Sequence, residues 1–168
     1  MIRDGNGRRS AEGAAGGVPG IDDEGGRDVE QNVQEVMSPD PIALPATSTA
    51  AEAAMAMRDA TIGAVVVLDS NRNVFGIVTD RDIAVRAVAE GLDPTTAQLE
   101  QICSRALVTL AHTDSVEDAE RVMRQQALRR LPVVDAGRAV GIVSLGDLAR
   151  VRDPDSALAD ISTAPANG

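Results

Sequence analysis

The sequence predicts an α/β (α+β) fold of two β-α-β-β-α units, packed with a pseudo-two-fold relation behind a disordered N-terminal tail. Three observations lead to this prediction. The chain of 168 residues contains an internal repeat. Each copy alternates short β-branched segments with segments of helical period, which indicates mixed strands and helices. Each copy spans about 50 to 60 residues, too few for a stable core of its own, so the two copies should pack together.

The repeat consists of matched residues at a nearly constant offset. Ala64–Asp69 matches Arg130–Asp135 at an offset of 66 residues, and Gly76–Thr79 matches Gly141–Ser144 at an offset of 65. The difference indicates a one-residue deletion in the turn between the two matched segments. Matches at such regular spacing do not arise from a high content of Ala and Val alone.

The first half of each unit is predicted to be a short extended piece followed by a capped helix. The extended pieces are Pro41–Leu44 and Leu107–Leu110. The clusters Thr47–Thr49 and Thr113–Ser115 then offer side-chain oxygens that cap a helix N-terminus. After each cluster, apolar residues recur on one helical face. These residues are Ala50, Ala53, Ala56 and Met57 in the first unit, and Val116, Ala119, Val122 and Met123 in the second.

The second half of each unit is predicted to be two strands closed by a helix. β-branched residues indicate buried strands, and turn residues rich in Asp, Asn or Gly separate each pair. The strands are Ala64–Leu68 and Val74–Val78 in the first unit, and Leu131–Val134 and Ala139–Val143 in the second. The closing helices are Asp80–Ala89 and Gly146–Val151, and Gly91 is placed as a C-cap of the first.

The two ends of the chain differ from the repeats. Residues 1–30 contain eight of the 15 glycines and few apolar residues, so they are expected to be a disordered tail. The first repeat is assigned to residues 31–95 and the second to residues 96–155. Residues 156–168 are expected to form a C-terminal tail.

Composition excludes several classes of function. The net charge is −10 and Phe75 is the only aromatic residue, which argues against nucleic-acid binding. No apolar run is long enough to cross a bilayer and no secretory signal is visible, so the cytoplasm is the expected compartment. One cysteine and one histidine, Cys103 and His112, leave no metal cluster and no nucleophile–base relay. We therefore expect neither a metal site nor catalytic residues, and no enzyme activity.

The repeated motifs resemble those of tandem cystathionine-beta-synthase-type (CBS) domains, often called a Bateman module. The resemblance rests on Gly76–Asp82 and Gly141–Asp147, each with Gly, a hydrophobic strand, Thr or Ser, two spacers and Asp. Leu131–Asp135 matches the central strand of the family. The resemblance covers residues 31 to 152 and includes two motif copies at the expected spacing. Thr79–Ile83 and the later Gly91–Pro94 are similar to stand-alone members, which carry no attached enzyme or transporter.

Each motif has a structural and a functional interpretation. Thr79 with Asp82, and Ser144 with Asp147, have the three-residue spacing of a capping box, which would stabilise a helix start by about 1 kcal/mol. The same geometry also suits a nucleotide. A helix N-terminus and a hydroxyl attract phosphate, and a carboxylate one turn later accepts from ribose hydroxyls. The resemblance implies the second role, and the two interpretations are compatible.

The resemblance also implies the remaining contacts of two clefts between the repeats. Backbone and aliphatic groups would hold adenine, with Pro41 and Ile42 facing Asp147, and Leu107 and Val108 facing Asp82. Because the chain has no Lys, phosphate must be held by Arg. Arg130 matches a position where relatives place a phosphate-binding Arg, and Arg81 lies inside the first motif. Their counterparts Ala64 and Gly146 carry no charge, so the two clefts should differ in charge.

Two functions remain open. The first is a non-enzymatic sensor that binds AMP, ADP, ATP or a related adenosyl compound and signals through a change of shape or dimer geometry. No cofactor is required, and the expected partners are a second copy of the chain and an unknown protein effector. The second is a ligand-free, stress-related interaction module whose clefts are vestigial and whose motifs only cap helices.

Overall fold

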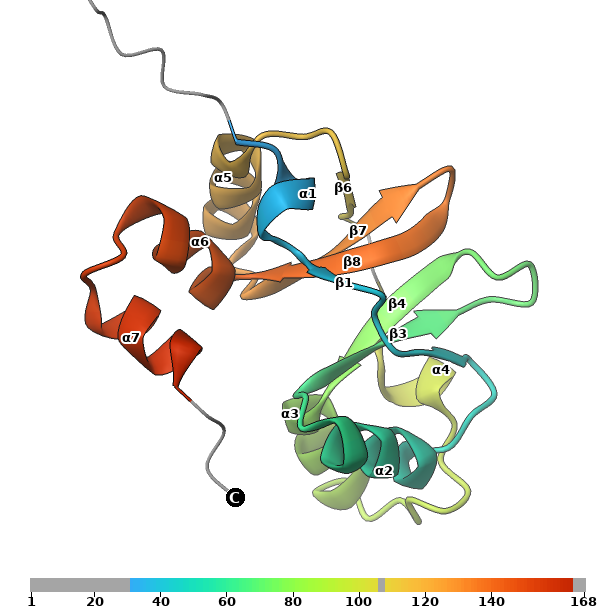
Figure 1. The fold of residues 1–168 in the computed structure, drawn as a ribbon. Helices are drawn as coiled ribbons and strands as arrows, with labels where there is room; N and C mark the ends of the chain where they lie inside the picture. Colours follow the sequence, from blue (N-terminus) through green and yellow to red (C-terminus); the bar gives the residue numbers. More distant parts are fainter. Residues whose placement is uncertain (1–30, 106–107, 165–168) are drawn as a thin grey trace, which may run out of the picture.

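The computed structural model describes residues 31–105 and 108–164, so the predictions for residues 1–30 and for Leu107 lie outside the described residues. Helices and strands alternate along the chain, which confirms the α/β class (Figure 1). The first half contains α1 (Val33–Val36), β1 (Ser38–Pro39), β2 (Ala43–Pro45), α2 (Ala50–Ala60), β3 (Ala64–Leu68), β4 (Val74–Thr79), α3 (Asp80–Asp82) and the π-helix η1 (Ile83–Val88). The second half contains α4 (Leu99–Ile102), β5 (Ser104–Arg105), β6 (Leu110–Ala111), α5 (Val116–Gln126), β7 (Arg130–Asp135), β8 (Arg138–Ser144), α6 (Leu145–Arg152) and α7 (Ala157–Thr163).

The strands form two four-stranded sheets that repeat one topology. In the first sheet the order is β2-β3-β4-β5, and in the second it is β1-β8-β7-β6. β2 runs parallel to β3, as β6 does to β7, because a helix connects each pair. The hairpins β3–β4 and β7–β8 are antiparallel, and each has a register shift near its turn. The predicted β-α-β-β-α order is therefore present in both repeats.

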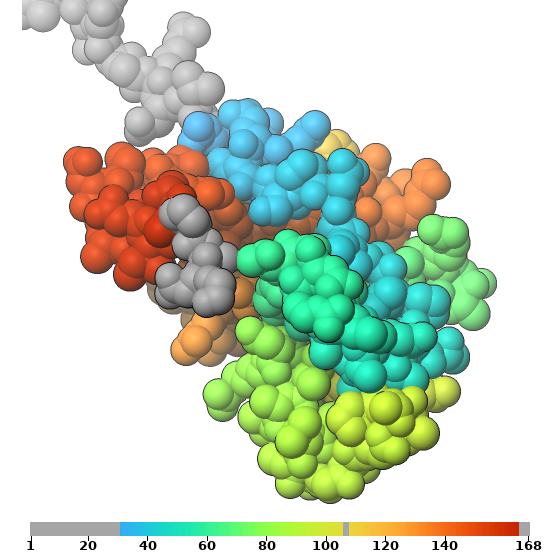
Figure 2. Space-filling model, turned by 60° about the horizontal axis from the view of Figure 1, so that its bottom comes forward, coloured from blue at the N-terminus to red at the C-terminus, as the bar shows by residue number. Residues whose placement is uncertain are grey.

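Each sheet takes its fourth strand from the start of the other repeat. β1 pairs with β8 of the second repeat, while β5 pairs with β4 of the first. Figure 2 shows residues 31–45, in blue, running from the orange second repeat to the green first repeat. The sequence did not predict this exchange, because a two-residue strand shows no hydrophobic period.

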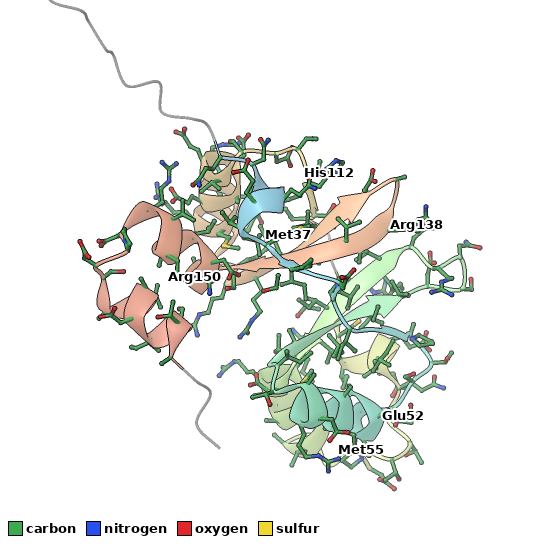
Figure 3. All side chains as sticks on the ribbon, in the orientation of Figure 1. Met37, Glu52, Met55, His112, Arg138 and Arg150 are labelled. Carbon is green, nitrogen blue, oxygen red and sulfur yellow. The ribbon has the colours of Figure 1, made fainter. Side chains whose placement is uncertain are left out.

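Two motif glycines make room for the exchanged segments. A Cβ on Gly76 would lie 2.6 Å from the backbone oxygen of Ser104, closer than real side chains approach. A Cβ on Gly141 would collide with Met37, which lies beside β8 (Figure 3), and would be 3.1 Å from the oxygen of Ser38. The glycine at the start of each motif therefore permits close backbone packing.

Each sheet packs against its helices to form a separate core. The first core is built from α2, β3, β4, η1 and α4, and it includes the fully buried Leu99 and Ile102. These two residues fall within the range assigned to the second repeat. The second core is built from α5, β7, β8 and α6, and Val33 from the start of the chain is fully buried in it. The start of each predicted repeat thus packs into the core of the other repeat, and this exchange joins the two repeats.

The helices match the predictions in part. Thr49 and Ser115 cap α2 and α5 with side-chain oxygens, as their residue types predict. The helix predicted over Asp80–Ala89 is a short α-helix that continues as the π-helix η1. Gly91 has a φ of +72°, as expected of a helix-ending glycine, but it lies two residues beyond the C-cap of η1. Residues 156–168 were expected to be a tail, yet they contain α7, which packs against α6.

Candidate functional site

Both repeated motifs form complete capping boxes. In the first, the Asp82 carboxylate accepts from the Thr79 backbone N–H at 2.9 Å and from its hydroxyl at 2.7 Å. In the second, Asp147 accepts from the Ser144 N–H at 2.8 Å and from its hydroxyl at 2.6 Å. The return bonds, from the N–H of each Asp to the hydroxyl, are 3.2 and 3.3 Å. The capping interpretation is therefore correct for both motifs, and it leaves the ligand role open.

Each motif carboxylate also has an arginine partner on its own helix. Asp82 Oδ1 lies 3.4 Å from Arg86 Nε, and Arg86 also donates to the Ile102 carbonyl at 3.0 Å. Asp147 Oδ1 pairs with Arg150, one turn further along α6. The exposed fraction of the carboxylate side chain is 13% for Asp82 and 9% for Asp147. The surroundings of the two carboxylates are closely similar, so they form a matched pair for experiment.

A cleft of about 470 Å³ lies where residues from the two repeats meet. Small-molecule sites commonly have volumes of about 300 to 1,000 Å³. The lining contains five of the residues predicted to bind a ligand, namely Pro41, Ile42, Arg130, Ser144 and Asp147. The structure therefore brings these five side chains together from segments far apart in the sequence.

Aliphatic side chains form one part of the cleft wall. Ile42, Ile62 and Ala64 come from the first repeat and Ile142 from the second. Such a wall can hold a flat apolar ring without an aromatic partner, through burial of apolar surface. This agrees with the expectation that a chain without Tyr and Trp would use aliphatic contacts.

Four charged residues also line the cleft, two of each sign. Arg130 and Arg150 are the cations, and Asp40 and Asp147 are the anions. Arg130 is exposed, and its Nη2 lies 3.3 Å from the position that a Cβ on Gly63 would occupy. The Arg130 side chain therefore reaches across to the first repeat. Figure 3 shows Arg150 on α6, beside the space between the repeats. Two arginines can thus meet an anion here although the whole chain carries a charge of −10.

Arg150 and Ser162 also line this cleft, although the sequence did not single them out. The spacing of Arg150 from Asp147 is that of a helical i, i+3 pair, but many surface residues share this spacing. No pattern indicated Ser162, because its segment was expected to be a tail. The missed residues therefore depend on how α6 and α7 pack.

A second, smaller cavity also lies between residues of the two repeats. This cavity of about 160 Å³ is lined by Val108, Arg105, Arg130 and hydrophobic residues of both repeats. Thr79, Arg81 and Asp82 line neither this cavity nor the larger cleft, and Leu107 lies outside the described residues. Of the residues predicted for a second cleft, the structure places only Val108 in this cavity. The ligand roles of Thr79, Arg81 and Asp82 stay predictions.

The described residues contain no group of three or more His, Cys, Asp and Glu side chains that could hold a metal ion. Cys103 is a free, buried thiol in the first core. Burial raises the pKa of this thiol, and the nearby Arg105 only partly opposes the rise. A thiol with a raised pKa is a poor nucleophile, so Cys103 behaves as the small buried hydrophobe that the sequence indicated. Within residues 31–105 and 108–164, no helix is both long and apolar enough to cross a membrane.

Comparisons with known proteins agree with the fold and the motifs. The family model of the CBS domain matches residues 33–88 and 99–153. CBS domain-containing protein YhcV of Bacillus subtilis is 39% identical over 118 residues, which cover 70% of this chain and 83% of the relative. Hypoxic response protein 1 of Mycobacterium tuberculosis is 35% identical over 102 residues, which cover 61% of this chain and 71% of the relative. Among the first curated relatives, the matched length ranges from 62% to 83% of the relative.

Solved structures show the same architecture. Hypoxic Response Protein I, whose structure holds two coordinated zinc ions, has a TM-score of 0.66 at 31% identity, covering 71% of this chain and 98% of that one. The CBS domain pair of protein MJ0100, in complex with 5′-methylthioadenosine and S-adenosyl-L-methionine, has a TM-score of 0.66 at 27% identity, covering 75% and 98%. The family model covers both repeats with their motifs, and the chain therefore belongs to the CBS domain family.

Proposed function

We propose that this CBS pair is a sensor that binds an adenine nucleotide of the AMP type in the cleft between its repeats. CBS-domain proteins are generally regulatory modules without catalysis. The observation that carries the proposal is the lining of the cleft, which contains Asp147, Ser144 and Arg130 together with Pro41 and Ile42. The complex of the MJ0100 domain pair with two adenosyl compounds supports the choice of an adenosine-type ligand.

The hydrogen bonds of Asp147 without ligand indicate what a bound ribose must replace. A carboxylate offers about four lone-pair positions for hydrogen bonds. Ser144 uses two on Oδ2, and Arg150 uses one on Oδ1. Two ribose hydroxyls would need two positions, so the ligand must displace Arg150 from Asp147. The released guanidinium would then be available to a phosphate beside Arg130.

Calorimetric titration of the full chain with AMP, ADP, ATP and adenosine tests this proposal. We expect at least one nucleotide to bind, and Arg130→Ala to weaken nucleotides by about 10- to 100-fold through loss of a charge-assisted hydrogen bond. Adenosine carries no phosphate, so its affinity should be unchanged in this variant. An absence of binding at millimolar nucleotide would overturn the proposal, and equal losses for AMP and adenosine would overturn the role of Arg130.

A ligand-free interaction module is the second candidate. The observation that favours it is that Asp82 and Asp147 are already satisfied by caps and arginines in the structure. In that case the motifs would serve only helix stability. The same titration separates the two candidates, because a ligand-free module would give no heat of binding.

We also propose that the chain forms a homodimer through its helices and signals to a protein effector. Exposed apolar side chains lie on or beside these helices, including Val85 and Val88 on η1 and Leu145 on α6. A sedimentation mass near twice 17.4 kDa is expected. Val88→Asp should shift the chain toward monomer, while Ile161→Asp on α7 should not. A monomeric wild-type chain would contradict this arrangement. Since the proposed ligands are cytoplasmic metabolites, the proposal also assigns the protein to the cytoplasm.

A further inference from the structure

The C-terminal helix α7 forms part of the cleft that the two repeats create. Ser162 of α7 lines the cleft together with Ser144 and Asp147. Figure 1 shows α7 packed beside α6. The helix spans Ala157–Thr163, beyond the residues 99–153 that match the second CBS domain. The helix therefore lies outside the part of the chain that the family model matches.

The contact between α7 and α6 depends on Gly146. A Cβ at position 146 would collide with the Ser162 hydroxyl and would lie 2.9 Å from Ser162 Cβ. The same point is 3.6 Å from Ser144 Oγ, so the two hydroxyls flank the first turn of α6. In the first repeat, Arg81 occupies the matching position and is exposed. The missing side chain thus allows α7 to approach the second motif closely.

The packing of α7 buries only one of its side chains. Ala159 is 3% exposed and is the single buried residue of the helix, whereas Ile161 is 72% exposed. A helix of seven residues has little stability without such packing. The helix is tied to the end of α6 by Ser156, whose N–H donates to the Asp153 carbonyl at 3.0 Å. Release of α7 would therefore expose little apolar surface and keep the helix near the cleft.

We infer that α7 closes the phosphate end of the cleft and makes the site select one phosphoryl group over three. This inference rests on the proposed function. The Ser144 hydroxyl, the first turn of α6 and Arg150 mark the end where a phosphate would lie, and Ser162 stands against that end. On this inference, AMP binds with α7 in place, whereas the two further phosphoryl groups of ATP require α7 to move. If α7 is released in about one tenth of the molecules, ATP binds about tenfold more weakly than a freely open cleft would allow.

The first experiment measures the affinities of AMP and ATP for the full chain with and without a side chain at position 146. We expect wild type to bind AMP about tenfold more tightly than ATP. Gly146→Ala should push α7 away and bring the two affinities within about twofold of each other. An unchanged ratio in a folded Gly146→Ala variant that has released α7 would overturn the inference.

Release of α7 is measured separately by thiol labelling of an Ala159→Cys variant. Native Cys103 is buried and provides the slow background, which is subtracted with wild type. We expect saturating ATP to speed labelling about tenfold, AMP to leave it unchanged, and Gly146→Ala to speed it without ligand. Labelling that does not respond to bound ATP would overturn the inference while the proposed function stands. Failure of both nucleotides to bind would defeat the proposed function itself, and with it the selectivity.

Discussion

Replacing the two motif carboxylates separates their structural role from their proposed ligand role. Asp82→Ala and Asp147→Ala each remove the carboxylate half of a capping box, while the backbone N–H at that position still donates to Thr79 or Ser144; the loss costs about 1 kcal/mol. Each also removes the partner of a half-exposed arginine, Arg86 or Arg150, which adds up to about 1 kcal/mol after solvent screening. Both variants should therefore lose about 1 to 2 kcal/mol of unfolding free energy, by similar amounts.

Nucleotide binding should respond in only one of the two variants. Asp147 lines the large cleft and Asp82 does not, so only Asp147→Ala should remove the proposed hydrogen bonds to a ribose. That loss should weaken AMP by at least about tenfold, given about 1.5 to 3 kcal/mol for hydrogen bonds to a charged group. Urea unfolding gives the stabilities and calorimetry at 25 °C gives the affinities of the folded variants. Equal weakening of AMP by both variants would refute the assignment of the site, and unchanged stability in both would refute the capping account.

Two further predictions concern the core. Cys103 should react slowly with thiol reagents at neutral pH. The free energy of unfolding should fall above about pH 9, because the raised pKa of the folded state lets the unfolded thiol lose its proton first. Rapid alkylation of native protein, or equal alkaline losses of stability in wild type and Cys103→Ala, would contradict this. Gly76→Ala should destabilise the chain by about 1 to 3 kcal/mol because the Ser104 backbone must shift. Gly63→Ala meets only side-chain ends at 3.3 Å and should change stability far less in the same urea experiment.

Local patterns predicted the repeated elements because local chemistry determines them. The run Ala64–Leu68 is apolar and β-branched, and the structure has a strand with these bounds. Thr49 and Ser115 cap helices because their hydroxyls accept from backbone N–H groups within the same turn. The cleft residues Pro41, Ile42 and Asp147 were brought together correctly because the resemblance to the family supplied the packing of one repeat on the other.

Features that depend on packing between distant segments were missed. β1 and β5 contain two residues each, and their pairing with the opposite repeat leaves no period in the sequence. The place of Ser162 in the large cleft also follows from tertiary contacts. The glycine at position 146 was recognised as a missing side chain, but the helix that fills its space could not be identified from the sequence.

The most direct test of the binding site is methyl NMR of the nine isoleucines during titration with AMP. Ile42, Ile62 and Ile142 line the large cleft, whereas Ile102 is 1% exposed in the first core and serves as an internal control. An adenine ring held against the aliphatic wall should shift the methyl signals of the three cleft isoleucines, all with the same dissociation constant. Asp147→Ala should weaken that binding by at least about tenfold. Unchanged cleft methyl signals at saturating AMP, or shifts confined to isoleucines outside the cleft, would contradict the account.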